Sequence, residues 1–307
     1  MTPINQENRL NRARGALLGL AVGDAIGTTV EFKSRGSFIP LTDMVGGGPF
    51  DLLPGQWTDD TSMALCLAVS LVEHGFDTHD QMQRYLLWHD EGYLSSTGEC
   101  FDIGSATSTA LERFRRTGNP VAGSTHPDSA GNGSIMRLAP IPIHYLDTPE
   151  LAIQMSAAQS KMTHRAPECL GACHLLAESL IRALQGRAKE DVLAPSLQTL
   201  AMSNSLMRIA AGQYKTKSAS DIKGSGYVVE SLEAAFWCFW KTDNFQDCVL
   251  LAANLGDDAD TTAAVAGQLA GAFYGGSDIP SAWLKKLTMA KEIGLLAEQL
   301  ALQKPKQ

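Results

Sequence analysis

Helical periodicity runs through almost the whole of this 307-residue chain. Apolar residues recur at spacings of three and four, whereas alternating β-branched runs are almost absent. Small residues are frequent in these segments, as between Ala263 and Ala272, and they let helix axes approach closely. The sequence therefore predicts a compact all-α fold. The predicted helices are Asn8–Val22, Thr61–Glu73, His79–Trp88, Ser105–Arg115, Glu150–Ser160, Ala166–Leu184, Ala194–Ala211, Val228–Trp240, Phe245–Leu255, Thr261–Tyr274 and Pro280–Leu300.

Glycine-rich and polar stretches separate the helices. Residues 46–49, 123–128 and 131–134 are expected to form loops at one end of the bundle. Residues 186–221 contain Pro195 with several Ser and Lys residues, and we interpret them as a surface excursion. The chain has no internal repeat and no flexible linker, so we expect a single domain over residues 1–307.

Charge and composition narrow the classes of function. The net charge of -8 argues against a protein that holds nucleic acid mainly through its phosphates. No stretch reaches the ~18 apolar residues that a membrane span needs, and the short apolar run Gly15–Val22 is interpreted as a core helix. The six cysteines form no CxxC pair, and they are interpreted as thiols of a reducing, cytoplasmic compartment.

Two clusters of carboxylate and threonine are the strongest candidates for chemistry. Residues 58–61 and 257–261 each begin an apolar helical stretch, where Asp and Thr commonly cap the first turn. For one cluster alone, capping is the better explanation, but adjacent carboxylates repel each other unless a cation or proton lies between them. Oxygen ligands of this kind suit Mg²⁺ or Mn²⁺, and the spacing leaves one or two ions open. The candidate ligands are Thr58, Asp59, Asp60, Asp258, Asp260 and Thr261.

A glycine-containing loop and two further polar residues are weaker candidates. Gly131 and Gly133 would let backbone N–H groups approach a pyrophosphate, although such a glycine pair is more often just a turn. Arg137 either contacts a phosphate or ties loops together. His164 either positions the substrate or makes a structural hydrogen bond, and we expect no proton transfer from it. Asp102 precedes a predicted helix, which by default makes it a cap.

Taken together and in order, seven motifs resemble those of the ADP-ribosylglycohydrolase family, and most closely its dinitrogen-reductase-activating branch, which removes ADP-ribose from modified arginine. The resemblance covers about residues 10 to 275 and implies an orthogonal multi-helix bundle typical of that family. The motifs are Asn11–Gly27, Glu31–Phe32, Trp57–Thr61, Gly131–Arg137, Thr163–His164, Gly226–Leu232 and Asn254–Thr262.

The resemblance implies roles for individual residues. Both clusters would hold two divalent cations, with Glu31 beside them, and Asp102 would face the scissile bond. The chain departs from the family pattern at Asp257, where a glycine is usual. Catalytic roles fall on Glu31, Asp60 and Asp102. The residues expected to line the ADP-ribose pocket are Gly131, Asn132, Gly133, Ser134, Met136, Arg137 and His164.

The predicted function is a metal-dependent hydrolase that removes ADP-ribose from modified protein side chains, first of all from arginine. Its partners would be an ADP-ribosylated protein and the ADP-ribose product. Serine-linked or O-acetyl-ADP-ribose are alternative substrates. Another alternative is an immunity protein that neutralises an ADP-ribosylating toxin by hydrolysis or by direct binding. The metal-site acids favour an enzyme over a module that only binds ADP-ribose.

Overall fold

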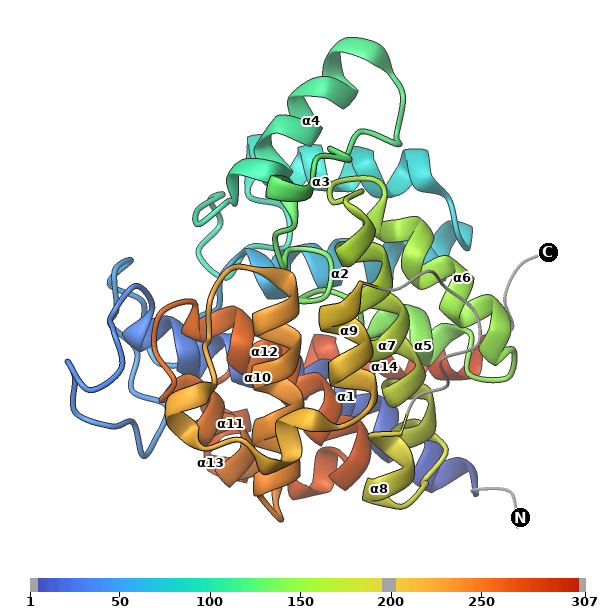
Figure 1. The fold of residues 1–307 in the computed structure, drawn as a ribbon. Helices are drawn as coiled ribbons and strands as arrows, with labels where there is room; N and C mark the ends of the chain where they lie inside the picture. Colours follow the sequence, from blue (N-terminus) through green and yellow to red (C-terminus); the bar gives the residue numbers. More distant parts are fainter. Residues whose placement is uncertain (1–4, 195–202, 304–307) are drawn as a thin grey trace.

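The computed structural model describes residues 5–194 and 203–303, and within these ranges it has fourteen α-helices and no strand (Figure 1). The predicted all-α fold is confirmed. The helices are α1 (Gln6–Gly27), α2 (Asp59–His74), α3 (Thr78–Glu91), α4 (Ser105–Thr117), α5 (Pro140–His144), α6 (Pro149–Ser160), α7 (Pro167–Leu184), α8 (Lys189–Val192), α9 (Asn204–Ala210), α10 (Val228–Lys241), α11 (Phe245–Ala253), α12 (Ala259–Tyr274), α13 (Ser281–Lys286) and α14 (Ala290–Leu302).

Two of the predicted helices need correction. The expected helix Pro280–Leu300 is wrong as a single element, because residues 287–289 are not helical and separate α13 from α14. Met289 has a left-handed backbone there (φ 57°), and the N–H of Thr288 donates to the carbonyl of Gly55 (2.9 Å) instead of continuing the helix. Of the expected helix Ala194–Ala211, α9 is the helical part that is described, while residues 195–202 lie outside the described ranges.

Helices α1 and α12 form the tightest contact of the core. Four glycines of α1 recur at every fourth residue and face four small residues of α12 in antiparallel register. A Cβ added at Gly19 would lie 2.3 Å from the carbonyl oxygen of Gly267, and one added at Gly23 would lie 2.1 Å from that of Ala263. These distances are far below van der Waals contact, so any side chain at these positions would push the helices apart. The facing pairs are Gly15–Gly271, Gly19–Gly267, Gly23–Ala263 and Gly27–Ala259.

A second group of helices extends from this core. Figure 1 shows α3 and α4 stacked beyond α2, on the side away from α11 and α13. Buried side chains of α2, α3 and α4, including Met63, Tyr85 and Phe114, form a separate apolar cluster, while other residues of α2 face the main core. Helix α2 therefore joins the two groups, and its first turn lies where they meet α12. Among the described helices, none combines the length and apolarity that crossing a membrane requires.

Candidate active site

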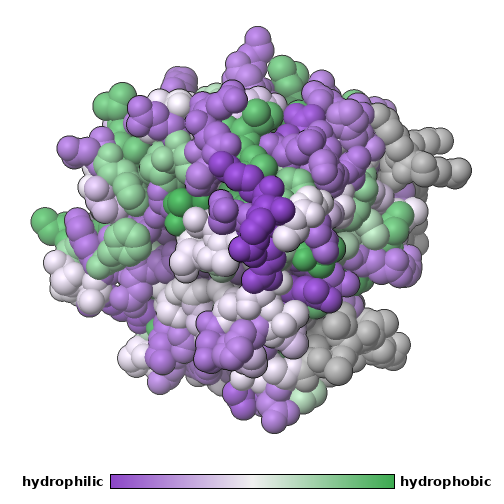
Figure 2. All heavy atoms as spheres, turned by 90° about the horizontal axis from the view of Figure 1, so that it is seen from above, coloured by the Kyte–Doolittle hydropathy of each residue, from purple (hydrophilic) through white to green (hydrophobic). Residues whose placement is uncertain are grey.

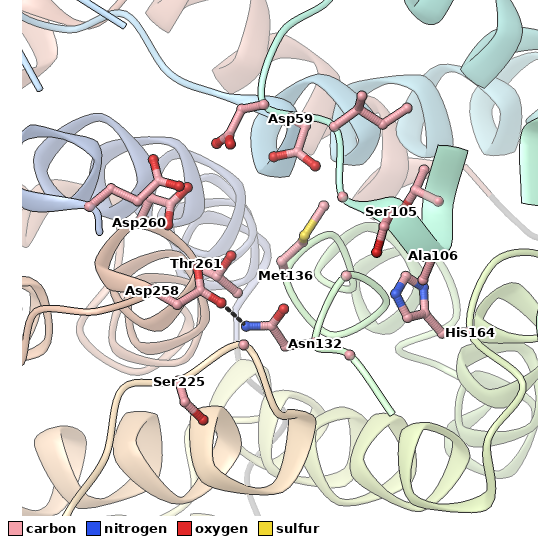
Figure 3. A pocket seen from close by; sticks show the side chains of 18 of the residues that line it. Asp59, Ser105, Ala106, Asn132, Met136, His164, Ser225, Asp258, Asp260 and Thr261 are labelled. Carbon is pink, nitrogen blue, oxygen red and sulfur yellow. Dashed lines mark hydrogen bonds between the residues drawn. The ribbon is translucent and has the colours of Figure 1, made fainter. Parts of the chain in front are cut away.

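A cavity of about 720 Å³ lies where the ends of several helices meet. Its walls come from the chain just after α1, the first turns of α2, α4 and α12, and the loops before α5 and α10 (Figure 3). Most of the site residues predicted from the sequence line it, whereas Thr58, Asp60, Ser134 and Arg137 do not. The predicted residues in its lining are Glu31, Asp59, Asp102, Gly131, Asn132, Gly133, Met136, His164, Asp258, Asp260 and Thr261.

The first acid–threonine cluster is held in place by Asp24 of α1, a residue for which no role was predicted. Its buried carboxylate accepts hydrogen bonds from the N–H groups of Thr58 (2.9 Å) and Thr61 (3.0 Å), and from their hydroxyl groups (2.9 and 2.6 Å). Asp24 thereby caps α2 from a different helix, and no side chain of the cluster makes the capping bond at Thr58. Capping therefore does not explain Asp59 and Asp60.

The threonines of the two clusters each face a carboxylate of the other. Thr58 Oγ1 lies 3.3 Å from Asp260 Oδ2, and Thr261 Oγ1 lies 3.2 Å from Asp60 Oδ1. Because the single hydroxyl proton of Thr58 is closer to Asp24, its lone pairs face Asp260. Two acceptor oxygens at this separation are typical of neighbouring ligands on one small cation, which in an octahedral Mg²⁺ shell lie about 3 Å apart.

The carboxylates form two groups that could each hold a cation, and the groups share one residue. In the first, oxygens of Asp59, Asp60 and Asp260 lie within 4.8 Å of one another; in the second, the same holds for Glu31, Asp102 and Asp260. Figure 3 shows Asp260, Asp258 and Thr261 on one side of the pocket and Asp59 across from Asp260. The structure thus brings together acids that are about two hundred residues apart, as the two clusters predicted.

Burial and mutual repulsion disfavour the ionised forms of these acids. Burial, with Asp102 and Asp258 next, raises the pKa of Glu31 to about 9. Burial and Asp24 raise the pKa of Asp102 to about 7, and burial raises that of Asp24 to about 6 despite its four hydrogen bonds. The pKa values of Asp59, Asp60 and Asp260 rise well above the ordinary range for the same reasons. The cluster therefore requires protons or cations to offset its charge.

Several buried oxygens support cations as the partners. Glu31 Oε2, Asp60 Oδ2 and Asp260 Oδ1 are shielded from solvent and have no hydrogen-bond partner in the described part of the chain. Buried polar atoms are normally satisfied, so each of these needs a ligand. Carboxylate and hydroxyl oxygens are a hard donor set, which fits Mg²⁺ or Mn²⁺. The residues present therefore fit a divalent-cation site.

The loop before α5 forms the opposite side of the pocket. Asn132 donates from its Nδ2 to Asp258 Oδ2 (2.7 Å), which connects this loop to the acid cluster (Figure 3). A Cβ at Gly133 would lie 2.6 Å from the ring of His164, and one at Gly131 would lie 3.3 Å from it. The close packing of His164 against the loop is thus one physical reason why glycine occupies positions 131 and 133.

Arg137 does not reach the pocket, contrary to the phosphate contact considered for it. Its side chain is fully buried and donates to Gln159 Oε1 (3.0 Å) and Thr163 Oγ1 (2.7 Å), with its guanidinium over the ring of Tyr85. The structure supports the other interpretation, a residue that ties loops together. Ser134 is also buried away from the cavity, where Ser160 Oγ donates to its hydroxyl (2.8 Å).

His164 lines the pocket and is held from behind by Thr163. Thr163 Oγ1 accepts from Arg137 Nη2 (2.7 Å) and lies 2.8 Å from His164 Nδ1. Burial, followed by the charge of Arg137, lowers the pKa of His164 to about 3. The imidazole is therefore neutral near neutral pH, where it can make a hydrogen bond to substrate but has no extra proton to transfer.

Three residues that line the pocket have left-handed backbones although none is glycine. They are Phe32 (φ 61°), Asp102 (φ 59°) and Asp257 (φ 57°). Asp257 stands where the sequence pattern has a glycine, and its φ explains why glycine suits that position. Its backbone exchanges two hydrogen bonds with the chain after α1: the N–H of Phe32 donates to Asp257 O (2.7 Å), and that of Asp257 donates to Lys33 O (2.8 Å). Such conformations collect at functional sites.

The chain is similar along nearly its whole length to proteins of one family. The profile of the ADP-ribosylglycohydrolase family matches residues 5–307. The chain is 50% identical over 298 residues to the ADP-ribosylarginine hydrolase Tri1 of Pseudomonas putida, covering 97% of this chain and 80% of that protein. It is 36% identical to the ADP-ribosyl-[dinitrogen reductase] glycohydrolase of Rhodospirillum rubrum, over 92% of each chain. The similarity to Tri1 therefore exceeds that to the branch that the motifs suggested.

A solved structure gives the same result for the fold. The chain superposes on an ADP-ribosylglycohydrolase-related protein complex with a TM-score of 0.87 and 43% sequence identity, covering 96% of this chain and 98% of the other. The family profile spans nearly the whole length, and the acids that carry the motifs meet in one pocket. The chain is therefore an ADP-ribosylglycohydrolase, a member of the ADP-ribosylglycohydrolase family of hydrolases.

Proposed function

We propose that this protein is a divalent-cation-dependent ADP-ribosylarginine hydrolase, which cleaves the N-glycosidic bond between ADP-ribose and an arginine side chain. The observation that carries the proposal is the pair of acidic groups that share Asp260, in a pocket whose other side is the loop 131–136. The relatives are consistent with it, since the Pseudomonas putida protein is named an ADP-ribosylarginine hydrolase.

We infer that the site holds two cations. Asp59, Asp60 and Asp260, with Thr58, would hold one, and Asp260 with Asp258 and Thr261 would hold the other, with Glu31 beside it. When bound, Mg²⁺ or Mn²⁺ would hold ribose hydroxyl groups and offset negative charge beside the anomeric carbon. Asp60 follows Asp59 in the first turn of α2 and is fully buried, and as a cation ligand it would mainly set the position of the attacking water.

The carboxylates of Glu31 and Asp102 would have different roles in the reaction. Glu31 would take a proton from water as the water oxygen attacks C1, while the C1–N bond to the guanidinium group breaks with oxocarbenium character. The bonding electrons leave with the guanidine nitrogen, which regains a proton from solvent or Asp102. Asp102, which has an oxygen within 4.8 Å of oxygens of Glu31 and Asp260, would face the arginine. Asn132 and His164 would orient the ADP-ribose, the latter through its neutral ring.

We also propose that the substrate is an ADP-ribosylated protein in the cytoplasm and that neither nucleic acid nor a membrane takes part. Free thiols at all six cysteines, five of them buried, support a reducing compartment. The net charge of -8 is unfavourable for binding to phosphate backbones. Protection of a cell against an ADP-ribosylating toxin is compatible with this activity, since hydrolysis would reverse the toxin's modification.

The test is a turnover assay with three substrates: peptides that carry ADP-ribose on arginine or serine, and O-acetyl-ADP-ribose. We expect release of ADP-ribose and unmodified arginine with Mg²⁺ or Mn²⁺, and none after chelation. Asp60→Asn should reduce kcat by at least about a hundredfold. Full activity in EDTA would contradict the metal site, and turnover of the serine-linked peptide alone would contradict the arginine linkage.

A further inference from the structure

Two short segments at the pocket have the same composition, an acidic residue next to a phenylalanine. Glu31–Phe32 follows α1, and Phe101–Asp102 precedes α4. Oxygens of Glu31 and Asp102 lie within 4.8 Å of one another, in the acidic group that includes Asp260. One residue in each segment, Phe32 and Asp102, has a left-handed backbone. The two carboxylates thus converge in the cavity from different parts of the chain.

The phenylalanine rings of the same segments converge beside the carboxylates. Phe50 lies between them, with its ring centroid 6.4 Å from that of Phe32 and 5.2 Å from that of Phe101. We call these three residues the aromatic rim. Phe32 lines the cavity, and 69% of its surface is exposed. Apolar side chains also gather on the left of Figure 2, the side on which Figure 1 places the loop between α1 and α2.

The position of Phe32 points to a ligand contact. The backbone conformation with φ 61° is unfavourable for a bulky residue, and burial of the ring does not offset the strain, since most of the ring is exposed. The strained backbone instead keeps the apolar ring of Phe32 in the cavity that Glu31 and Asp102 also line. A ring beside carboxylates is the combination that recognises a guanidinium group, which stacks on aromatic faces and pairs with acids.

The position of the aromatic rim also argues against the adenine of ADP-ribose as the group that it contacts. In ADP-ribose, two ribose rings and a pyrophosphate separate the adenine from the anomeric carbon. Phe32 lines the same cavity as Glu31 and Asp102, the acids around which the anomeric carbon would bind. Of the residues that would orient the ADP-ribose, Asn132 donates to Asp258, and His164 lies across the pocket from Asp258 and Asp260 (Figure 3). The group next to the rim is therefore the acceptor, on the far side of the scissile bond.

We propose that Phe32, the one member of the aromatic rim that lines the cavity, forms the acceptor subsite and contacts the guanidinium group and aliphatic stem of the modified arginine, while Phe50 and Phe101 pack behind it. It is thereby a specificity-determining residue that favours arginine-linked over hydroxyl-linked ADP-ribose. A serine acceptor has neither a cation nor a long apolar stem, so it gains nothing from the ring. The inference rests on the proposed function and names the residue that selects its substrate.

The test compares Phe32→Asn with the parent protein. Asparagine tolerates the left-handed backbone, so the variant removes the ring without adding strain. The matched control is Leu53→Asn, because Leu53 belongs to the same loop, is 68% exposed and does not line the cavity. Phe32→Tyr keeps the aromatic face. We would measure kcat and KM with arginine- and serine-linked ADP-ribosyl peptides, and the Kd of free ADP-ribose by calorimetry.

Phe32→Asn should raise KM for the arginine-linked peptide about two- to fivefold, the range of an exposed cation–π contact. Any turnover of the serine-linked peptide, the Kd of ADP-ribose and both parameters of Leu53→Asn should stay at the parent values, and Phe32→Tyr should restore the parent KM. An unchanged KM, an equal loss for both peptides, or a weakened ADP-ribose Kd overturns the acceptor subsite. A parent protein that hydrolyses only the serine-linked peptide overturns the proposed function as well.

Discussion

Removing the cations should make the stability of this protein fall as the pH rises. The cause is the raised pKa of the buried acids. Asp102 has an ordinary pKa of 3.8 and a pKa of about 7 in the fold, and Glu31 goes from 4.5 to about 9. Above about pH 5, the unfolded chain has lost both protons while the folded, metal-free protein still holds them. The folded state therefore binds more protons, and raising the pH favours unfolding.

The magnitude follows from the number of protons. Each carboxyl that stays protonated only in the fold costs about 1.4 kcal/mol per pH unit. Asp102 is partly exposed, which screens its share, so we take about 2 kcal/mol per pH unit for the pair. This value is a lower bound, because the raised pKa values of Asp59, Asp60 and Asp260 act in the same direction. From pH 5.5 to pH 7 the free energy of unfolding falls by about 3 kcal/mol, which is a large part of the 5–15 kcal/mol that is typical of folded proteins. With an unfolding entropy of about 0.6 kcal/mol/K for a chain of this length, Tm should fall by about 5 °C.

Thermal unfolding in EDTA and in saturating Mg²⁺, at several pH values from 5.5 to 8, measures this effect. Cations displace the protons, so the gap between the two Tm values should widen as the pH rises. Glu31→Gln removes one of the two protons and should flatten the slope in EDTA, whereas Glu292→Gln, at an exposed position of α14, should leave it unchanged. A Tm in EDTA that is constant or rises over this range would refute the reasoning.

Three further predictions concern packing and support of the site. Gly267→Ala should destabilise the protein by about 1–3 kcal/mol in urea unfolding, because its Cβ would lie 2.1 Å from Gly19 O, whereas Gly294→Ala, with its nearest neighbour at 3.9 Å, should be neutral or stabilising. Arg137→Gln should lower Tm while leaving the Kd of ADP-ribose within about twofold, since the guanidinium lies outside the pocket; a selective loss of ADP-ribose binding would contradict this placement. Asp24→Asn should weaken Mg²⁺ binding about 10- to 100-fold by calorimetry, because it replaces one of the two carboxylate oxygens that orient Thr58 and Thr61, and unchanged affinity would exclude a positioning role.

The fold was largely predictable because helical periodicity is a local signal. Long helices such as α7 and α12 begin and end within two residues of their predicted bounds. The errors lie where local signal fails. Helices α5 and α8 have five and four residues, too few to show a period, and the break before α14 depends on a contact with Gly55 that is distant in sequence.

The acidic residues of the site could be predicted from the sequence, whereas the residues that hold the site in place could be predicted less well. Two carboxylate clusters exceed the needs of capping, so their chemistry was visible in the sequence. Asp24 looked like the end of an apolar run, since nothing local shows that its carboxylate caps a helix that begins 35 residues later. Arg137 was ambiguous for a related reason: a guanidinium binds phosphate or closes a core network equally well, and only its burial against Tyr85 decides.

The glycine contact between α1 and α12 determines when the cation site can form during synthesis of the chain. These helices lie far apart along the chain, at residues 6–27 and 259–274. A nascent chain therefore cannot assemble the cation site until α12 has left the ribosome, after almost the whole sequence has been made. Until then, the acids after α1 and at the start of α2 lack Asp258 and Asp260. Hydrolase activity should thus appear only with the complete fold, without an active amino-terminal intermediate.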